Sequence, residues 1–429
     1  MSALVTDRDR LATMQACLEQ GLMEPAVFEL VVRELPPRRN FLVAAGLEQA
    51  LQFLKSLSFS EAEFAWLRDH GGHSPELLEY ARTLRFNGDV DAMPEGTVFF
   101  AGEPILRISA ALPLALLVES RLLNLVHFET SIASSAARLV TAAGGRRLID
   151  FGLRQAHGAE AALLAARAAY IAGFDGTCTA DASRRFGIPS FGTLGMRPAD
   201  AGIATLAVLA RASPGRITLL IDTSAAATSA ESLAVLTSAL RRDGDSSGGP
   251  QTDGDTGARA VALRGLLDAT GLADLTIYAS GDLDEEGVAN LIESGAPIDG
   301  FGLRGWLSSA AESGLVDAVY AMRQYGSSDD SDTSDASDRS APGAAWPGAR
   351  NVLRRLGADG RIECDLIVRQ REIGDAQALL QPCMRAGKRV GRAPTLNESR
   401  AHHASQVASL PAELRGLRHA NRTVPVTTR

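Results

Sequence analysis

Apolar and polar positions along the middle of the chain predict strands and helices in turn. Residues 148–152 form an apolar run typical of a buried strand, and the Ala- and Leu-rich segment 161–172 favours a helix that ends at Gly173. Residues 174–178 and 188–193 predict two further short strands. Strand, helix and strand joined by short connections are typical of a parallel α/β unit.

The same alternation continues as far as residue 302. Strands are expected at 217–223, 275–280 and 298–302, helices at 201–211, 229–242 and 285–294, and a short strand at 258–263 that leads into a helix up to residue 270. This regularity predicts a closed or nearly closed α/β barrel. Polar residues at the carboxyl ends of such strands face the ligand, and here they are Arg154, His157, Asp175, Thr177 and Thr193.

The segments before and after the barrel predict a second body. Helices are expected within residues 1–24, 44–57, 60–70 and 74–84, and strands at 27–35, 98–101 and 104–110. Ser60 with Glu63 three positions later forms a capping box, and Gly102-Glu103 predicts a hairpin turn between the last two strands. Residues 112–143 predict an almost continuous helix with a break near Glu129. Strands and turns after residue 345, and a closing helix at 398–418, complete this prediction.

Two segments rich in Gly, Ser and Asp, 243–257 and 326–341, interrupt the pattern. Neither has enough apolar side chains to offset its ordering entropy, which predicts two mobile acidic loops. Asp253 and Asp255 resemble part of a calcium loop, but no bidentate glutamate follows at the required distance, so a solvated loop is favoured. The expected domains are an N-terminal α/β domain (1–125), the barrel (126–325), an acidic linker (326–345) and a C-terminal extension (346–429).

Composition narrows the class of protein. The 429 residues are 45% hydrophobic and 22% charged, which suffices for one large core and a smaller one. The net charge of −8 argues against a nucleic-acid partner. No apolar run reaches membrane-spanning length and no signal-peptide pattern is present, so a cytoplasmic protein without a membrane partner is expected. The cysteines have no metal-ligand spacing, so we expect reduced thiols and no metal site: Cys17, Cys178, Cys364 and Cys383.

Several short motifs occur in an order that resembles the nicotinate phosphoribosyltransferase family. They are Asp-Phe-Gly-Leu-Arg at 150–154 followed by Ala-His-Gly at 156–158, Ala-Ala-Tyr-Ile-Ala-Gly-Phe-Asp-Gly-Thr at 168–177, Ser-Gly-Asp-Leu-Asp-Glu at 280–285, and Ile-Asp-Gly-Phe-Gly at 298–302. The resemblance implies an irregular α/β barrel of the type II phosphoribosyltransferase kind, with an N-terminal α/β domain and a C-terminal extension packed on it. It also implies a homodimer.

The family reaction joins nicotinate to phosphoribosyl pyrophosphate and gives nicotinate mononucleotide in NAD salvage, with Mg²⁺ assisting the departure of pyrophosphate. Arg154 is the candidate for an anion, with a surface arginine as the alternative, and His157 is either a ligand contact or a helix cap. Ser280-Gly281-Asp282 and Asp222 follow strands and are candidates for sugar hydroxyls or phosphate, with plain turns or caps as the alternative. The full predicted substrate-binding set is Arg154, His157, Thr177, Thr193, Asp222, Ser280, Gly281, Asp282 and Gly302.

Other positions depart from the family pattern. Met196 stands where the family has the histidine that is phosphorylated to couple ATP hydrolysis, so no catalytic residue is assigned. The family's phosphate turn corresponds in this chain to Gly302-Leu303-Arg304-Gly305. Arg304 has a side chain at a position where the family usually has glycine. Three hypotheses follow: the family reaction without ATP coupling, a catalytically silent regulatory homologue, or a transferase for another base or phosphosugar. The departures by themselves favour the second or third.

Overall fold

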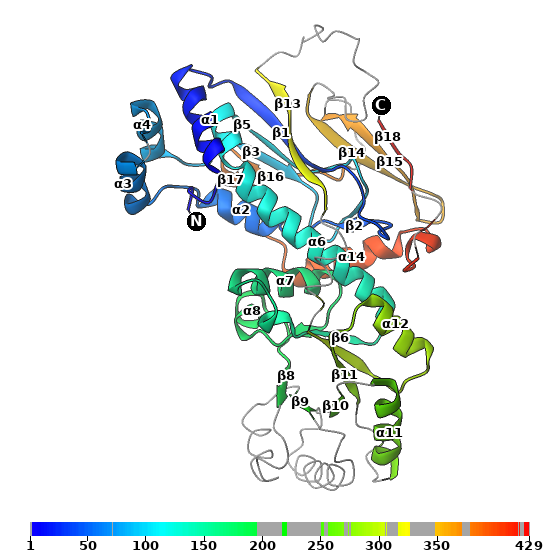
Figure 1. Cartoon of the computed structure of the whole chain (residues 1–429). Coiled ribbons are helices and arrows are strands. Elements are labelled where there is room, and N and C mark those ends of the chain that lie inside the picture. Colours follow the sequence, from blue (N-terminus) through cyan, green and yellow to red (C-terminus); the bar gives the residue numbers. More distant parts are fainter. Residues whose placement is uncertain are drawn as a thin grey trace. The chain divides into compact units, whose positions relative to one another are not determined.

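The computed structural model describes residues 2–70, 72–194, 217–220, 250–252, 256–269, 273, 276–304, 306, 316–326, 348–370, 378–418, 420 and 424–428. They belong to two compact units, one made of Met1–Ser131 with Leu315–Arg429 and the other of Ile132–Gly314 (Figure 1). The first unit therefore combines both ends of the chain.

Strands from both ends of the chain build an antiparallel six-stranded sheet in the first unit. Its order is β13 (Ala318–Tyr325), β1 (Pro25–Val32), β5 (Pro104–Ala111), β3 (Asp89–Ala92), β16 (Gln381–Arg385) and β17 (Lys388–Arg389). The apolar run predicted as a strand at 27–35 is β1, which lies between β5 and β13 (Figure 1). Because β16 and β17 extend this sheet beyond β3, the predicted packing of the C-terminal extension on the N-terminal domain is confirmed.

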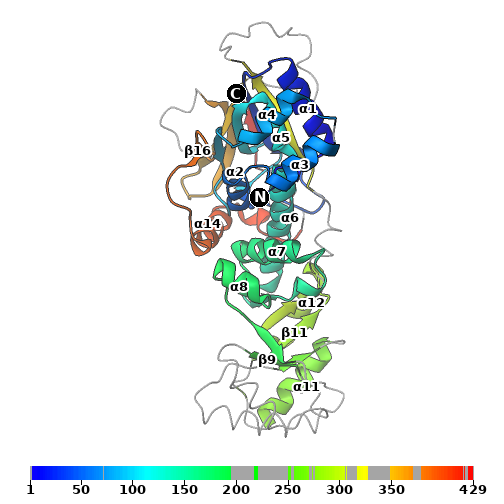
Figure 2. The same ribbon diagram turned by 90° about the vertical axis from the view of Figure 1, so that its left-hand side faces the viewer.

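Helices cover this sheet and each other. The helix α1 (Arg8–Glu19) packs against α5 (Leu112–Leu117), which lies on β1 and β5. The helix α4 (Pro75–Thr83) packs against α1 and α3 (Glu61–His70) (Figure 2). The predicted capping box of α3 is confirmed, since the Ser60 N–H donates to the Glu63 carboxylate at 2.7 Å and the Glu63 N–H donates to the Ser60 hydroxyl at 3.3 Å.

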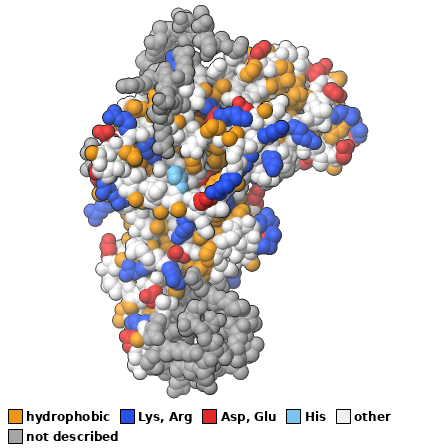
Figure 3. Space-filling view, turned by 180° about the vertical axis from the view of Figure 1, so that it is seen from behind, with side chains coloured by type: hydrophobic (Ala, Val, Ile, Leu, Met, Phe, Trp, Pro, Cys, Tyr) orange, Lys and Arg blue, Asp and Glu red, His pale blue; other side chains and the backbone are white. Residues whose placement is uncertain are grey.

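Smaller elements complete the first unit. They are α2 (Leu47–Lys55), the pair β2 (Leu42–Val43) and β4 (Val98–Phe99), the three-stranded sheet of β14 (Arg350–Leu356), β15 (Ile362–Arg369) and β18 (Val426–Thr428), the helix α14 (Leu396–Ala408) and the short turn η5 (Ala412–Leu414). One apolar cluster joins Val98 and Phe100 to Ile362, Leu410 and Val424, so the two ends of the chain share a core. Basic, acidic and apolar side chains are interspersed on the face of the molecule shown in Figure 3.

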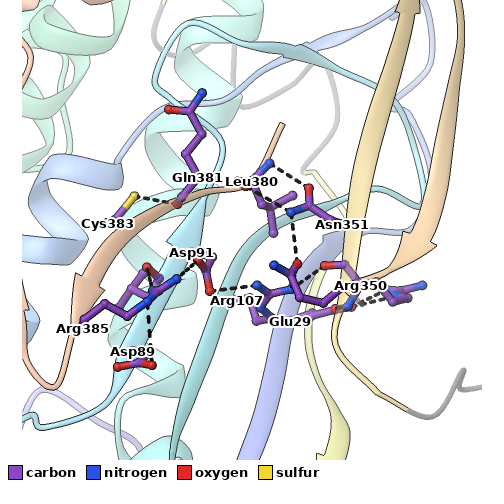
Figure 4. Close-up of polar contacts among 12 residues, drawn as sticks. Glu29, Asp89, Asp91, Arg107, Arg350, Asn351, Leu380, Gln381, Cys383 and Arg385 are labelled. Carbon is purple, nitrogen blue, oxygen red and sulfur yellow. Dashed lines mark hydrogen bonds and ion pairs between the residues drawn. The ribbon is translucent and has the colours of Figure 1, made fainter. Parts of the chain in front are cut away.

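Buried ion pairs lie among the strands of the first unit and include pairs between its N-terminal strands and strands from later in the chain (Figure 4). The Glu29 carboxylate on β1 is fully buried and accepts hydrogen bonds from Arg350 Nε at 2.7 Å and Arg323 Nε at 3.2 Å. Arg107 on β5 donates to Asp91 at 2.8 Å and to the backbone carbonyl of Arg350 at 2.7 Å. Opposite charges at hydrogen-bond distance offset the cost of removing these groups from water.

The second unit is built on a parallel seven-stranded sheet. Its order is β7 (Gly176–Thr177), β6 (Arg147–Asp150), β12 (Gly300–Leu303), β11 (Tyr278–Gly281), β10 (Pro250–Thr252), β9 (Ile217–Leu220) and β8 (Gly192–Leu194). Ser190, just before β8, forms a parallel bridge with Thr177 of β7, so the described strands form a closed ring. The predicted α/β barrel is confirmed.

Helices alternate with these strands. They are α7 (Ala159–Ala172), α8 (Ala180–Phe186), α11 (Thr256–Ala269) and α12 (Glu285–Glu293), and the short turn η1 (Gly152–Arg154) follows β6. The long helix α6 (Glu119–Ala143) contributes residues to both units. As predicted, α7 ends at Gly173, whose φ of 121° favours glycine.

Two predictions for the first unit are wrong. Residues 98–101 and 104–110 do not form a hairpin, because β4 pairs with β2 whereas β5 pairs with β1 and β3. In the turn between them, the buried Glu103 carboxylate accepts a hydrogen bond from the N–H of Phe100 at 2.9 Å. The helix expected to break near Glu129 divides at Val118 instead, and α6 passes through Glu129 because a buried polar side chain leaves its backbone hydrogen bonds intact.

Three further expectations also differ from the structure. Residues 258–263 lie within α11 rather than in a strand, as their Ala, Leu and Arg content favours. The acidic segment 243–257 is not wholly a loop, because β10 pairs through its backbone with β9 and β11 whatever its side-chain composition. The closing helix predicted to reach residue 418 ends at Ala408 in α14. Residues 327–341 lie outside the described residues, as do the helices expected at 201–211 and 229–242.

Candidate active site

The carboxyl ends of four neighbouring barrel strands lie in register. Across the sheet, Thr177 of β7 is opposite Asp150 of β6, Asp150 is opposite Leu303 of β12, and Leu303 is opposite Gly281 of β11. Three backbone hydrogen bonds extend the row into the following loops, from Cys178 N–H to the Asp150 carbonyl, from Phe151 N–H to the Leu303 carbonyl and from Arg304 N–H to the Gly281 carbonyl. This row, from Thr177 to Gly281, is named the strand-end edge.

A buried carboxylate holds the centre of the strand-end edge. Asp150 is 2% exposed, and its Oδ2 accepts the Thr177 hydroxyl at 2.7 Å. Its Oδ1 accepts the N–H of Gly152 at 2.9 Å and the indole N–H of Trp306 at 3.2 Å. Burial raises the pKa of Asp150, and these three hydrogen bonds act in the opposite direction. The Thr177 hydroxyl in turn accepts the N–H of Thr179 at 3.0 Å, so its capacity is used within the protein.

Cys178 follows β7 directly. Burial and the neighbouring Asp150 carboxylate raise the pKa of its thiol to about 11, although the positive charge of Arg154 acts against them. A thiol with this pKa is protonated near neutral pH, so it is a poor nucleophile.

The predicted polar residues of β6, β11 and their loops meet at one end of the barrel. Arg154 and His157 are exposed on the segment that follows β6, and Asp282 is exposed directly after β11. Gln155, next to Arg154, donates to the Asp282 carboxylate at 3.4 Å, which connects the two loops. The N-cap of α7 is Gly158 and that of α12 is Asp284, so the helix-cap alternatives for His157 and Asp282 are wrong.

Glycines along these strands leave room for neighbouring aromatic rings. A Cβ atom added to Gly302 would lie 2.3 Å from the ring of Phe151, and one added to Gly300 would lie 2.3 Å from the ring of Tyr278. Ser280 is buried and opposite Gly302 in the parallel ladder. Gly302 is therefore required at least for packing, and its contact with a substrate stays a prediction.

The remaining predicted residues divide into three cases. Thr193 lies in β8 opposite Thr218 of β9. Asp222 and Met196 lie outside the described residues. Asp175 was expected at the carboxyl end of a strand, and this is wrong: it precedes β7, and its carboxylate accepts the N–H of Leu148 near the amino end of β6 at 2.9 Å.

Two features escaped the sequence prediction. The predicted strand at 148–152 gives Asp150 no role, although a single acidic residue in an apolar run is typical of a buried hydrogen-bonded carboxylate. The ion pair between Arg138 on α6 and Glu285, the first residue of α12, has distances of 2.8 Å and 2.6 Å and connects residues 147 positions apart. Only the fold could reveal that pair.

Two features are absent from the described part of the chain. No group of three or more His, Cys, Asp and Glu side chains there could hold a metal ion. None of the helices described is both long and apolar enough to cross a membrane. Of the acidic residues predicted to bind substrate, Asp282 lies in the described part of the chain, where it is exposed directly after β11.

Solved structures define the class of the fold. Human nicotinic acid phosphoribosyltransferase superimposes with a TM-score of 0.82 over 99% of this chain and 98% of that chain, at 24% sequence identity. Nicotinate-nucleotide pyrophosphorylase from Pyrococcus furiosus gives a TM-score of 0.70 over 95% of both chains, at 19% identity. The fold is thus that of a type II phosphoribosyltransferase, with a barrel and a second unit formed by both chain ends.

Sequence relatives identify the family. Residues 4–127 match the model of the nicotinate phosphoribosyltransferase (NAPRTase) N-terminal domain. Nicotinate phosphoribosyltransferase pncB2 of Mycobacterium tuberculosis is 36% identical over 431 aligned positions, which cover 99% of this chain and 91% of that protein. Nicotinate phosphoribosyltransferase of Bacillus subtilis is 34% identical over 75% of this chain and 66% of its own length. The chain belongs to the nicotinate phosphoribosyltransferase family.

Proposed function

We propose that this protein joins nicotinate to phosphoribosyl pyrophosphate and releases nicotinate mononucleotide and pyrophosphate, the transferase reaction of NAD salvage. The observation that carries this proposal is the strand-end edge, where four strands end in register and a Gln155–Asp282 hydrogen bond connects the loops that carry Arg154 and Asp282. Similarity to relatives along nearly the whole chain supports the same reaction.

The silent-homologue and repurposed-transferase hypotheses are not favoured. Both rested on departures from the family pattern at single positions such as Met196. Relatives named nicotinate phosphoribosyltransferase match 99% and 100% of this chain at 36% and 32% identity, so the departures lie within an otherwise continuous similarity.

Each predicted residue has a chemical task in this proposal. Arg154 pairs with an anionic group, the nicotinate carboxylate or a phosphate, through charge-assisted hydrogen bonds. Ser280, Gly281 and Asp282 receive the sugar and its phosphate at the end of β11, where the Asp282 side chain is exposed. The bond between the sugar C1 and the pyrophosphate oxygen breaks, and the ring nitrogen of nicotinate forms the new bond to C1.

Mg²⁺ is expected to arrive with phosphoribosyl pyrophosphate and to neutralise charge on the leaving pyrophosphate. Mg²⁺ commonly binds one or two carboxylates together with substrate phosphates and water, which suits a single exposed acid such as Asp282. The family resemblance adds a homodimer to the proposal, and the cytoplasmic location expected in the sequence analysis is kept. The reaction is expected to run without ATP coupling, because Met196 cannot be phosphorylated as histidine can.

A direct assay tests the proposed function. Purified protein, nicotinate, phosphoribosyl pyrophosphate and Mg²⁺ should yield nicotinate mononucleotide and pyrophosphate, measured by chromatography. Added ATP should neither accelerate the reaction nor be hydrolysed in a nicotinate-dependent way. Absence of product under all these conditions would refute the proposal, whereas nicotinate-stimulated ATP hydrolysis would refute only the uncoupled form of it.

A further inference from the structure

The carboxylate of Asp150 connects three segments that end at the same edge of the barrel. The strand β6 lies between β7 and β12, and Asp150 is its last residue. The carboxylate accepts one hydrogen bond from its own loop at Gly152, one from the end of β7 at Thr177, and one from the segment after β12 at Trp306.

The contact at Thr177 extends the connection to a helix. Its hydroxyl donates to Asp150 and accepts the N–H of Thr179, the residue immediately before α8. On the other side of Asp150, Gly152 begins the turn η1 that ends at Arg154. The carboxylate thus fixes both the β7–α8 connection and the turn that carries Arg154.

A carboxylate at this position is costly for stability alone. The side chain is almost fully removed from water, since Asp150 is 2% exposed, and a buried carboxylate carries a large desolvation cost. Replacing buried polar groups by well-packed apolar ones is often neutral or stabilising. An apolar side chain at this position could not accept the three hydrogen bonds. These hydrogen bonds fix the start of two loops of the candidate site.

We infer that Asp150 is a positioning residue for the proposed reaction, holding the Arg154 turn and the Thr177–Thr179 segment in the geometry that binds nicotinate. This inference rests on the proposed function. Asp150 makes no contact with substrate in it and acts only through Gly152, Thr177 and Trp306.

The test compares variants that keep or remove single hydrogen bonds of this network. Asp150→Asn keeps the shape of the side chain but replaces one acceptor by a donor, and Thr177→Val keeps the shape of threonine but removes the hydroxyl. A misplaced loop should lower kcat/KM for nicotinate by about 10- to 100-fold in both variants. Calorimetric titration should show a matching loss of nicotinate affinity. Thr177→Ser, which retains the hydroxyl, should recover the activity that Thr177→Val loses.

Controls separate positioning from general destabilisation. Thr141→Val removes a hydroxyl that donates to the Ala137 carbonyl within α6, away from the network, so its kcat/KM should match wild type. All variants are assayed well below their measured melting temperatures. If Asp150→Asn and Thr177→Val melt earlier but keep the kcat/KM and nicotinate affinity of wild type, the role is only structural and the inference is wrong. If wild-type protein forms no product, the proposed function fails and the inference fails with it.

Discussion

At the scale of single residues, the strand-end edge combines fixed groups with exposed ones. Asp150 and Thr177 are buried and hydrogen-bonded to each other, whereas Arg154 and Asp282 are exposed on the loops that follow. A small ligand gains most from exposed charges whose backbone is held in advance, because less ordering entropy opposes binding. Ligand binding at this edge is therefore expected to depend on the charge of Arg154 and on the buried Asp150–Thr177 pair, which holds the loop of Arg154 in position.

Replacing Arg154 by alanine should weaken anion binding. The guanidinium is the cation on the η1 turn, and a hydrogen bond to a charged group contributes about 1.5–3 kcal/mol. Titration calorimetry with nicotinate and with phosphoribosyl pyrophosphate measures the loss and shows which anion Arg154 contacts. Arg184→Ala is the control, because Arg184 is an exposed arginine of the same unit that pairs with Asp181 on α8. Equal affinities of Arg154→Ala and wild type for both ligands would remove Arg154 from the site.

Replacing Gly302 by alanine should destabilise the barrel. The new methyl group would lie 2.3 Å from the ring of Phe151, and overpacking of this kind costs about 1–3 kcal/mol. Gly281→Ala is a matched control from the adjacent strand, since no atom lies within 4 Å of the added Cβ. Urea denaturation of the two variants measures the difference in unfolding free energy. Equal stability would mean that Phe151 moves aside without cost.

At the scale of elements, α12 is held at its first turn by contacts from within the second unit. Asp284 caps the helix by accepting the N–H of Gly287 at 2.7 Å. Arg138 on α6 forms a two-fold hydrogen bond with the adjacent Glu285, at 2.6 and 2.8 Å. The loop of Ser280 to Asp282 ends where α12 begins, so this anchor limits how far the predicted sugar and phosphate contacts can move.

Arg138→Ala should therefore cost more than the loss of a surface ion pair. The side chains of Arg138 and Glu285 are only 10% and 19% exposed. Removing one partner of a fully buried ion pair costs about 3–5 kcal/mol of unfolding free energy. Because this pair is partly exposed, we expect a cost at or below the lower end of that range. The pair Arg264–Asp268 on α11 is 22% and 53% exposed, and Arg264→Ala should cost about 1 kcal/mol or less. Chemical denaturation of both variants tests this order, which a larger effect of Arg264→Ala would contradict.

The sequence predicted elements well where local pattern decides the outcome. The strands β1, β6 and β11 and the helix α7 follow from apolar runs and helix-forming residues close to the predicted bounds. The pairing of β4 with β2 could not be predicted, because the Gly102-Glu103 turn looks the same whether its strands share a sheet or not. The strand β10 was not predicted, because its backbone hydrogen bonds form whatever the Gly, Ser and Asp content of the surrounding sequence.

The candidate site was predictable only in part for the same reason. Motif order pointed to Arg154 and Asp282, and the fold connects their loops through the Gln155–Asp282 hydrogen bond. The contacts of Asp150 with Thr177 and Trp306 span 27 and 156 positions, so no local spacing could indicate them. Asp175 was placed at the wrong end of its strand because β7 is only two residues long and its start could not be determined from the pattern.

At the scale of the whole molecule, both chain ends meet in the core of the first unit through buried charges. Glu103, after β4, lies beside Asp365 of β15, and both carboxyl groups are fully buried. Arg354 of β14 donates to Asp365 at 2.9 Å and 2.6 Å. Burial and the Arg354 charge lower the pKa of the nearby His402, so that histidine adds no second positive charge near neutral pH. One arginine thus faces two acids, which favours a proton shared between them.

The stability of the first unit should therefore decrease as pH rises, through Glu103. Burial and then Asp365 raise the pKa of Glu103 well above its ordinary value of 4.5, while Arg354 and the Phe100 N–H act in the opposite direction. A carboxyl group with a raised pKa in the folded state contributes stability that is fully present below its unfolded pKa. That contribution is lost as pH rises through the folded pKa, with a slope of up to about 1.4 kcal/mol per pH unit.

Glu103→Gln isolates this contribution, because its amide can donate to Asp365 at every pH. Denaturation in urea at about pH 5 and about pH 8 should show the variant gaining stability relative to wild type at the higher pH. Glu79→Gln removes an exposed carboxylate from α4 and should show no such gain. If the difference between Glu103→Gln and wild type is the same at both pH values, Glu103 is ionised in the folded protein. The two acids would then be held by Arg354 alone.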